Sequence, residues 1–143
     1  MKELTESEVY KLEECLKELS EHHNEVSRLF KGSYPKNPYS ITLKRFEADI
    51  KSGKSAICSI EDKERILGFC KIDIDGANGH IDYLVVLKKY RGNGYGDKLI
   101  SWALSVFEQR GVNWIELSVV DGNDAISFYE KYGFQVCSQI LRR

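Results

Sequence analysis

Three glycines alternate along the segment Arg91–Asp97, which reads RGNGYGD and stands between an apolar run and an amphipathic run. Because glycine has no Cβ, successive backbone N–H groups in such a loop can turn toward one concavity and bind an anion. A helix starting directly after the loop adds about half a positive charge and unpaired N–H groups at its first turn. The spacing therefore predicts a loop that holds a diphosphate through its backbone.

Two common phosphate-binding motifs do not fit this loop. A P-loop requires a hydroxyl residue directly after the lysine of a Gly-Lys pair, whereas Gly96 is followed by Asp97, Lys98 and Leu99. A dinucleotide fingerprint G-x-G-x-x-G that begins at position 92 or 94 requires glycine at position 97 or 99, and neither position holds one. The loop is therefore neither a P-loop nor a dinucleotide fingerprint.

Hydrophobic periodicity predicts the elements that position the loop. Apolar residues at helical intervals predict helices over residues 6–20, 26–32, 42–53, 94–110 and 124–132. Alternating or continuous apolar runs predict strands over residues 55–60, 65–74, 80–87, 113–120 and 134–141, and residues 2–4 are the candidate for an N-terminal strand. This order predicts an α/β fold with a mixed, mostly antiparallel sheet flanked by helices.

Length and charge narrow the class of protein. A chain of 143 residues predicts a single domain over residues 1–143 with a sizeable core. The net charge of −1 provides no basic field that would attract nucleic acid or an anionic membrane surface. No apolar run approaches the length of about 18 residues that predicts a membrane span, and the chain does not start with a signal pattern. We therefore expect a cytoplasmic protein that binds neither nucleic acid nor membranes.

The residues that commonly bind metals do not form a metal motif here. The cysteines at positions 15, 58, 70 and 137 fit no C-x-x-C spacing, and we expect all four to be buried free thiols. His22 and His23 are adjacent on a predicted helix, where neighbouring side chains point about 100° apart, and no third ligand is evident. We therefore expect no metal site, and we interpret the two histidines as substrate-facing groups or as surface residues at a helix end.

Two motifs together resemble the GNAT superfamily of N-acetyltransferases. The first is Arg91-x-x-Gly94-x-Gly96, placed after a strand and at the start of a helix. The second is GNDAISFYEKYGF over residues 122–134, which is similar to the Asn, Ala and Phe-Tyr-Glu-Lys-x-Gly-Phe run of that superfamily. The resemblance covers residues 55–141 and implies the GNAT fold, in which two central parallel strands splay apart.

The resemblance also implies acetyl-CoA as co-substrate. Its pantetheine arm is expected to lie in the gap between the splayed strands, like an added strand, with Asn123 at its side. The glycine loop is expected to bind the pyrophosphate. The cofactor-binding residues implied in this way are Leu84, Val85, Val86, Arg91, Gly92, Asn93, Gly94, Tyr95, Gly96, Asp97 and Asn123.

Two residues are the catalytic candidates. By motif position Tyr129 resembles the general acid of the superfamily, which protonates the departing CoA thiolate, while the alternative for Tyr129 is a packed helix aromatic. Asp82 is the first candidate for a base, because it is expected to share a strand face with Leu84 and Val86, and Glu116 on the neighbouring strand is the second. An ion-paired carboxylate at a strand end is the alternative for both.

The function expected from the resemblance is transfer of an acetyl group from acetyl-CoA to a primary amine, by direct attack in a ternary complex. No cysteine stands in a nucleophile motif, so we expect no acetyl-enzyme. The alternatives are a non-catalytic module that binds or senses acyl-CoA, and an enzyme for longer acyl chains. The acceptor amine is expected between the first helices and the splayed strands, near residues 21–24 and 34–39, and homodimers are frequent in the superfamily.

Overall fold

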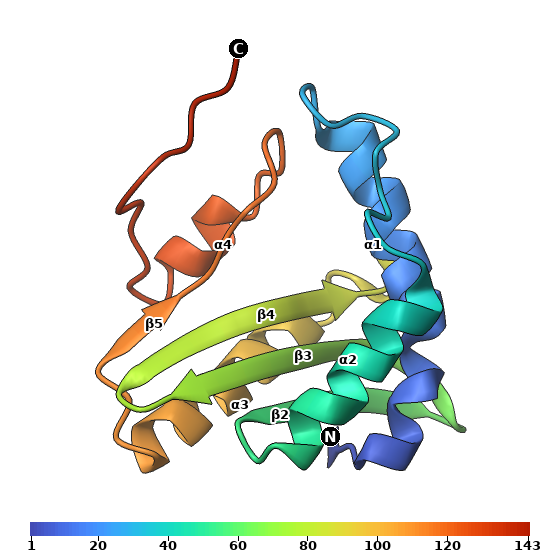
Figure 1. The fold of residues 1–143 in the computed structure, drawn as a ribbon, viewed down its shortest axis with the longest axis vertical. Helices are drawn as coiled ribbons and strands as arrows, with labels where there is room; N and C mark the ends of the chain where they lie inside the picture. The colour runs from blue at the N-terminus through green and yellow to red at the C-terminus, as the bar shows by residue number, and fades with distance from the viewer.

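The computed structural model describes residues 1–143 and contains one five-stranded sheet with the order β1-β2-β3-β4-β5 (Figure 1). The pairs β1–β2, β2–β3 and β3–β4 are antiparallel, and the pair β4–β5 is parallel. This confirms the predicted mixed sheet. The strands are β1 (Lys2–Glu3), β2 (Ser55–Asp62), β3 (Arg65–Asp75), β4 (Asn78–Val86) and β5 (Trp114–Glu116).

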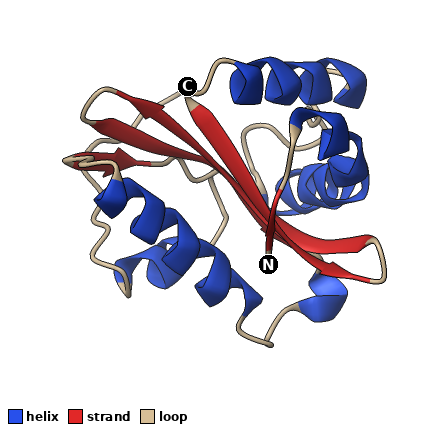
Figure 2. Cartoon of the chain, turned by 90° about the horizontal axis from the view of Figure 1, so that it is seen from below, coloured by secondary structure: helices blue, strands red, loops and turns tan.

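Helices cover both faces of this sheet (Figure 2). The α-helices are α1 (Glu13–Val26), α2 (Tyr39–Lys51), α3 (Tyr95–Gln109) and α4 (Ile126–Glu130), and the 3₁₀ helices are η1 (Glu6–Leu12) and η2 (Lys88–Tyr90). On one face, η1, α1 and α2 bury a core around Leu12, Phe46 and Phe69. On the other face, α3 buries a second core around Leu99 and Phe107, against which α4 also packs. None of the helices combines the length and the apolar character that crossing a membrane requires.

The N-terminal helices differ from the prediction at their boundaries. The predicted helix over residues 6–20 is a 3₁₀ segment followed by α1, which continues to Val26, and no separate helix forms over residues 26–32. Thr5 and Glu8 form a capping box at the start of η1. The helix predicted from Thr42 begins at Tyr39, directly after Pro38, whose extended backbone serves as the N-cap.

The C-terminal segment also differs. Of the strand predicted over residues 113–120 only Trp114–Glu116 pairs, and residues 134–141 form no strand. Ile140 is 98% exposed, so the alternation of apolar residues does not correspond to burial there. A strand over residues 134–141 would need a partner edge, and β5 is ordered as a strand for only three residues. β5 is therefore the edge strand of the sheet, and Cys137, predicted to be buried, is exposed.

Candidate active site

The two parallel strands separate after three residue pairs. β4 pairs with β5 at Asn78, Gly79 and His80, and from Ile81 onward it has no partner on that side. Residues 81–84 of β4 and residues 117–120 after β5 then line the same cavity, which has a volume of about 450 Å³. The gap lies above β4, between α1 and α4 (Figure 1). We call this space the first cavity; it opens where the predicted splay of β4 and β5 occurs.

The first cavity has two kinds of wall. One wall consists of β4 and the segment over residues 117–129, and it includes Leu84, Asn123 and Tyr129. The other wall, which we call the acceptor wall, comes from α1, the loop over residues 34–37 and α2. The acceptor wall consists of Leu16, Leu19, Ser20, His23, Tyr34, Pro35, Lys36, Asn37, Tyr39, Thr42 and Arg45.

The glycine loop lies between η2 and α3 and is exposed. Gly92 has a φ of +82° and Gly94 a φ of +78°, conformations that residues with a Cβ rarely adopt. No backbone acceptor in the loop receives the N–H groups of residues 92–94, and those of residues 95–97 form the first turn of α3, where helices leave them unpaired. Six consecutive amides are thus available to an anion at the start of a 15-residue helix.

The polar side chains of the loop bind the protein itself. The Nε of Arg91 donates to the carbonyl oxygen of Val86 at 3.1 Å, and Nδ2 of Asn93 donates to the carbonyl oxygen of Tyr90 at 3.0 Å. The carboxylate of Asp97 accepts hydrogen bonds from the hydroxyl of Tyr132 and, at 3.4 Å, from Lys131, and the bond from Tyr132 is the main reason that its pKa is lowered. These side chains hold the loop, and its backbone remains free.

Tyr129 lies in the wall of the first cavity, on α4. Its ring packs edge-on against Phe128 at 5.3 Å and Phe134 at 5.7 Å between centroids. Burial, with a smaller contribution from Cys70, raises the pKa of Tyr129 to about 12. The phenol therefore keeps its proton at neutral pH and is a possible donor toward the cavity.

Asn123 and the strand residues take different positions. The Asn123 side-chain oxygen accepts a 3.0 Å hydrogen bond from the amide of Ala125, so this side chain shapes the turn before α4 as well as lining the cavity. Leu84 and Val86 pack toward the core under α3, while Val85 packs toward the core under α1 and α2. Of the three, Leu84 lines the first cavity.

A β-bulge in β4 lies at Asp82. In the pairing of β4 with β3, Tyr83 lies opposite Lys71 and Ile81 lies opposite Ile72. Asp82 of β4 is therefore an extra residue with no partner in β3. An extra residue of this kind bends a strand and redirects one side chain. The bulge falls where β4 turns away from β5, and it therefore accompanies the opening of the first cavity.

The bulge also changes the face on which Asp82 lies. Leu84 and Val86 point toward α3, whereas the Asp82 carboxylate receives hydrogen bonds from Lys71 at 2.8 Å and from Arg45 at 3.2 Å on the α2 side. The prediction that Asp82 shares a face with Leu84 and Val86 is therefore wrong, because one inserted residue reverses the alternation. Both hydrogen bonds end on Oδ2 of Asp82, and this leaves Oδ1 without a protein partner in a side chain that lines the cavity.

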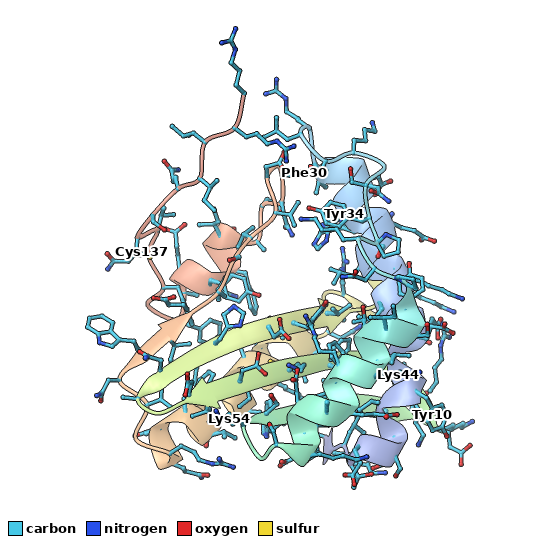
Figure 3. The ribbon with its side chains drawn as sticks, in the orientation of Figure 1. Tyr10, Phe30, Tyr34, Lys44, Lys54 and Cys137 are labelled. Atoms are coloured by element: carbon cyan, nitrogen blue, oxygen red, sulfur yellow. The ribbon has the colours of Figure 1, made fainter.

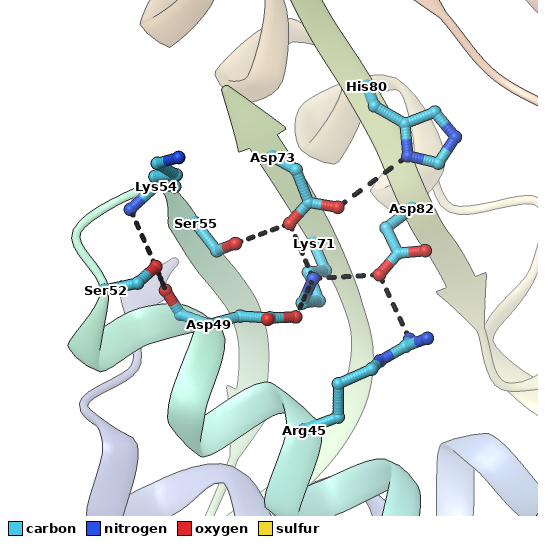
Figure 4. Close-up of polar contacts among 9 residues, drawn as sticks. All are labelled: Arg45, Asp49, Ser52, Lys54, Ser55, Lys71, Asp73, His80 and Asp82. Atoms are coloured by element: carbon cyan, nitrogen blue, oxygen red, sulfur yellow. Dashed lines mark hydrogen bonds and ion pairs between the residues drawn. The ribbon is translucent and has the colours of Figure 1, made fainter. Parts of the chain in front are cut away.

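Lys71 is the centre of a charge cluster that the sequence analysis missed (Figure 4). Its side chain is fully buried, and Nζ lies 2.9 Å from Asp49, 2.6 Å from Asp73 and 2.8 Å from Asp82. Burial opposes the charge of Lys71, but the hydrogen bonds that Lys71 donates to these carboxylates outweigh the effect of burial and raise the pKa of Lys71. A lysine between Cys70 and Ile72, which interrupts the apolar run over residues 66–72, was the available signal.

The same cluster contains a set of residues with the composition of a metal site. Ligand atoms of Asp73, His80 and Asp82 lie within 4.8 Å of one another. However, the Lys71 ammonium already contacts both carboxylates of this set, and the third member, His80, lies 3.7 Å from Asp73. A protein cation thus neutralises the position that a metal ion would otherwise fill.

The remaining predicted residues are Glu116, His22 and His23, and they do not share one cavity. Glu116 is exposed and lines a second cavity of about 600 Å³ at the paired ends of β4 and β5, and so it does not reach the first cavity. His23 lines the first cavity, and its ring lies 5.0 Å from that of Tyr34, while His22 is not in the lining. Burial, followed by the charge of His22, lowers the pKa of His23.

The loop before α2 is held in place at Tyr34. The Asn24 side chain donates to the carbonyl oxygen of Tyr34 at 2.9 Å and accepts from its amide at 3.0 Å. Tyr34 points from this loop toward the first cavity (Figure 3). The acceptor wall is therefore a constrained surface, although its loop has no regular secondary structure.

A parallel strand pair separates over a cavity next to a glycine loop that opens a helix, and this arrangement suits an extended, phosphate-bearing ligand. A family model described as the acetyltransferase (GNAT) family matches residues 16–134. The chain belongs to this family.

Similarities to individual proteins agree with this assignment. The chain is 39% identical over 79 residues to N-alpha-acetyltransferase 30 of Schizosaccharomyces pombe, a match that covers 51% of this chain and 53% of that protein. The chain thus matches about half the length of this curated relative.

Solved structures share the fold over nearly the whole chain. A mutant of the BH1408 protein from Bacillus halodurans superposes with a TM-score of 0.79 at 24% identity, covering 99% of this chain and 96% of that one. The PaiA N-acetyltransferase from Thermoplasma acidophilum, solved in complex with coenzyme A, superposes with a TM-score of 0.78 at 18% identity, covering 98% and 94%. At these identities the likeness concerns the fold.

Proposed function

We propose that the chain transfers the acetyl group of acetyl-CoA to a primary amine, by direct attack within a ternary complex. The observation that carries the proposal is the first cavity, which brings Leu84 on the free edge of β4 and Tyr129 on α4 to one space. The thioester and the amine would meet there. Family membership supports acetyl transfer. The first cavity supports a meeting of the thioester and the amine beside Leu84 and Tyr129.

The co-substrate would bind through the backbone. From Ile81 onward the edge of β4 that faces residues 117–120 has no strand partner, and an amide-bearing arm can pair there as an added strand would. Leaving a buried backbone group unpaired costs about 1–3 kcal/mol, so this edge favours such a ligand. The free amides of residues 92–97 would hold the pyrophosphate, with Arg91 bound to Val86 between the two sites.

Tyr129 is proposed as the acid. Loss of CoA leaves a thiolate, whose conjugate thiol has a pKa of about 8.5. A buried phenol with a pKa of about 12 remains protonated at neutral pH and can stabilise the developing thiolate by donating a hydrogen bond to it. No cysteine takes part, because Cys15, Cys58 and Cys70 are buried and Cys137 is exposed on the C-terminal segment, outside the lining of the first cavity.

Asp82 is proposed as the base. An alkyl ammonium with a pKa of about 10.4 is neutral in roughly one molecule per thousand at neutral pH, which adds about 4 kcal/mol to the barrier unless the proton is removed. Oδ1 of Asp82 is the carboxylate oxygen at the cavity that carries no protein hydrogen bond, while Lys71 and Arg45 hold Oδ2. Asp82 can therefore accept the proton directly or through a water.

The proposal is tested with purified protein by calorimetric titration of CoA and by thiol release from acetyl-CoA across a panel of amines. We expect CoA binding, amine-dependent turnover, and a fall in kcat of about a hundred-fold for Tyr129→Phe with the affinity for CoA kept. Tyr10→Phe, on an exposed tyrosine, is the matched control. CoA binding without turnover of any amine would instead support a silent acyl-CoA-binding module.

A further inference from the structure

The acceptor wall of the first cavity carries positive charge. Among its residues, Lys36 and Arg45 bear full charges and both are cationic. The Lys36 ammonium packs at 5.1 Å from the ring centroid of Phe30 and 5.7 Å from that of Tyr34, rather than against a carboxylate. Arg45 donates to Asp82 through one Nη2 hydrogen bond, and a guanidinium has five N–H donors. Both cations therefore have donors available to a ligand.

The one carboxylate in the cavity does not cancel these charges. Asp82 is the acidic residue of the lining, and its Oδ2 is paired with the fully buried Lys71 as well as with Arg45. Across the lining residues alone the formal charges are two positive and one negative, and Lys71 lies outside the lining. Asp49 and Asp73 also pair with Lys71, but they belong to the lining of the second cavity.

We propose that the acceptor is a small amine that also carries a carboxylate or phosphate group, and that Lys36 and Arg45 bind this anionic group. The inference rests on the proposed acetyl transfer and specifies its second substrate. Arg and Lys bind such groups through charge-assisted hydrogen bonds, and Arg can do so with two donors at once. The size follows from the cavity, because about 450 Å³ must hold the end of the thioester as well as the amine.

The same charges disfavour a polycationic acceptor. A second ammonium group would face Lys36 and Arg45 with no unpaired carboxylate oxygen nearby except Oδ1 of Asp82. In addition, positive neighbours favour the neutral form of an amine, which is the form that attacks a thioester. An anionic group held by Lys36 and Arg45 would instead fix the position of the acceptor in the cavity.

The second cavity has the opposite character and no part in this recognition. It is lined by Asp49, Asp73, Asp75 and Glu116 together with Lys54, His80 and the exposed Trp114. It shares no lining residue with the first cavity and does not contain Tyr129. An acceptor that reacts beside Tyr129 therefore meets the cationic wall.

Charge-matched acceptors test the inference. Thiol release is measured with β-alanine against β-alaninamide and with phosphoethanolamine against ethanolamine, with propanediamine as the dicationic probe and an uncharged tripeptide with a free N-terminus as the large one. We expect kcat/KM to be at least about ten-fold higher for the anionic member of at least one pair, and the better pair distinguishes a carboxylate from a phosphate. Equal rates within both pairs, or a preference for propanediamine or for the tripeptide, would overturn the inference.

Variants of the acceptor wall provide the second measurement. In Lys36→Gln the preference for the anionic acceptor is expected to fall about ten-fold, through KM, which corresponds to about 1.4 kcal/mol. Arg45→Gln is expected to lower it further, and Arg45→Lys to restore part of it. Lys44→Gln is the matched control. Lys44 is an exposed lysine on α2, the helix that carries Arg45, and it does not line the first cavity (Figure 3). A Lys36→Gln protein with the selectivity of the unmodified chain would contradict the inference.

Binding of the acetylated products distinguishes failure of the proposed transfer reaction from failure of the anion site. Calorimetry with the CoA-saturated protein compares N-acetyl-β-alanine with N-acetyl-β-alaninamide, and N-acetylphosphoethanolamine with N-acetylethanolamine. If no amine is turned over but an anionic product binds at least about ten-fold tighter than its neutral counterpart, and loses this advantage in Lys36→Gln, the anion site stands and the transfer reaction does not. If no product pair differs in affinity and no acceptor pair differs in rate, the anion site is rejected.

Discussion

The carboxylate of Asp121 accepts a hydrogen bond of 2.7 Å from the hydroxyl of Ser27, a residue 94 positions earlier in the chain. The other oxygen of Asp121 accepts from the amides of Arg28 at 2.8 Å and Leu29 at 3.2 Å. These bonds connect the end of α1 to the segment that leaves β5. They join the two walls of the first cavity at one end, so the shape of the cavity depends on this connection.

Gly122→Ala is expected to break the connection. Gly122 has a φ of +78°, and an added Cβ would lie 2.0 Å from the carbonyl oxygen of Val26, which is backbone and cannot rotate away. Gly111→Ala is the matched control, because Gly111 has a φ of +68° but open space around its Cβ position. Both variants carry the strain of a positive φ, and the clash should make Gly122→Ala less stable by about a further 1–3 kcal/mol in urea unfolding. Equal destabilisation of the two variants would show that the α1 contact is not required.

Lys71→Met is expected to destabilise the fold by about 3–5 kcal/mol in chemical unfolding, because it leaves Asp49, Asp73 and Asp82 facing one another without their shared cation. The loss should shrink at acidic pH, where the carboxylates take up protons. Lys44→Met, on an exposed lysine of α2, should change stability by less than about 0.5 kcal/mol. A small effect of Lys71→Met at neutral pH would mean that the cluster is replaceable by apolar packing.

The acid limb of the stability curve should depend on Asp73. Burial opposes its charge, but hydrogen bonds from His80, Lys71 and Ser55 lower the pKa of Asp73 below its ordinary value. A carboxyl whose pKa is lower in the folded chain adds stability above its unfolded pKa of about 3.9, and this stability is lost as the pH falls through the folded value. Thermal unfolding between about pH 6 and pH 2 should therefore show a smaller fall in Tm for Asp73→Asn than for the unmodified chain. Parallel curves for the two proteins would exclude this role.

The alkaline side of the pH–rate profile should not report Tyr129. A phenol with a pKa of about 12 does not lose its proton in the range where the protein is assayed, so kcat should not decline up to about pH 10 on its account. A decline with an apparent pKa below about 10 that disappears in Tyr129→Phe would show that the folded tyrosine titrates normally.

On the acid side, Asp82→Asn should remove or shift the rise in kcat/KM if Asp82 is the base.

The glycine loop should show different tolerance at two neighbouring glycines. Gly94 has a φ of +78° at the N-cap of α3, so Gly94→Ala should reorient the free amides and weaken CoA binding by about ten-fold or more. Gly96 has an ordinary helical position, and its Cβ would meet Phe128 at 3.4 Å, so Gly96→Ala should have a smaller effect. Calorimetric titration of CoA with both variants checks this, and the reverse order would contradict a backbone-held pyrophosphate.

Local features of the chain were predictable because they depend on neighbouring residues. The glycines at positions 92 and 94 have a positive φ in a loop directly before α3, and a helix was predicted to start at that place. The hairpin of β2 and β3 and the position of β4 follow the alternation of apolar residues, with strands extended by one or two residues. The two motifs around Gly94 and Tyr129 were enough to indicate the family.

Tertiary structure decided the rest. Asp82 lies on the α2 face because a β-bulge forms between β3 and β4, and a bulge depends on the register of two strands rather than on the residues of one. The segment over residues 134–141 has a strand pattern but no paired edge, so Val136, Ile140 and Leu141 remain exposed. The positive charge of the first cavity likewise arises only when Lys36 and Arg45, which come from a loop and from α2, line one cavity with Asp82. A sequence determines which residues can pair or bend, but contact between distant segments determines which of them do, since hydrogen bonds and ion pairs form only at short range.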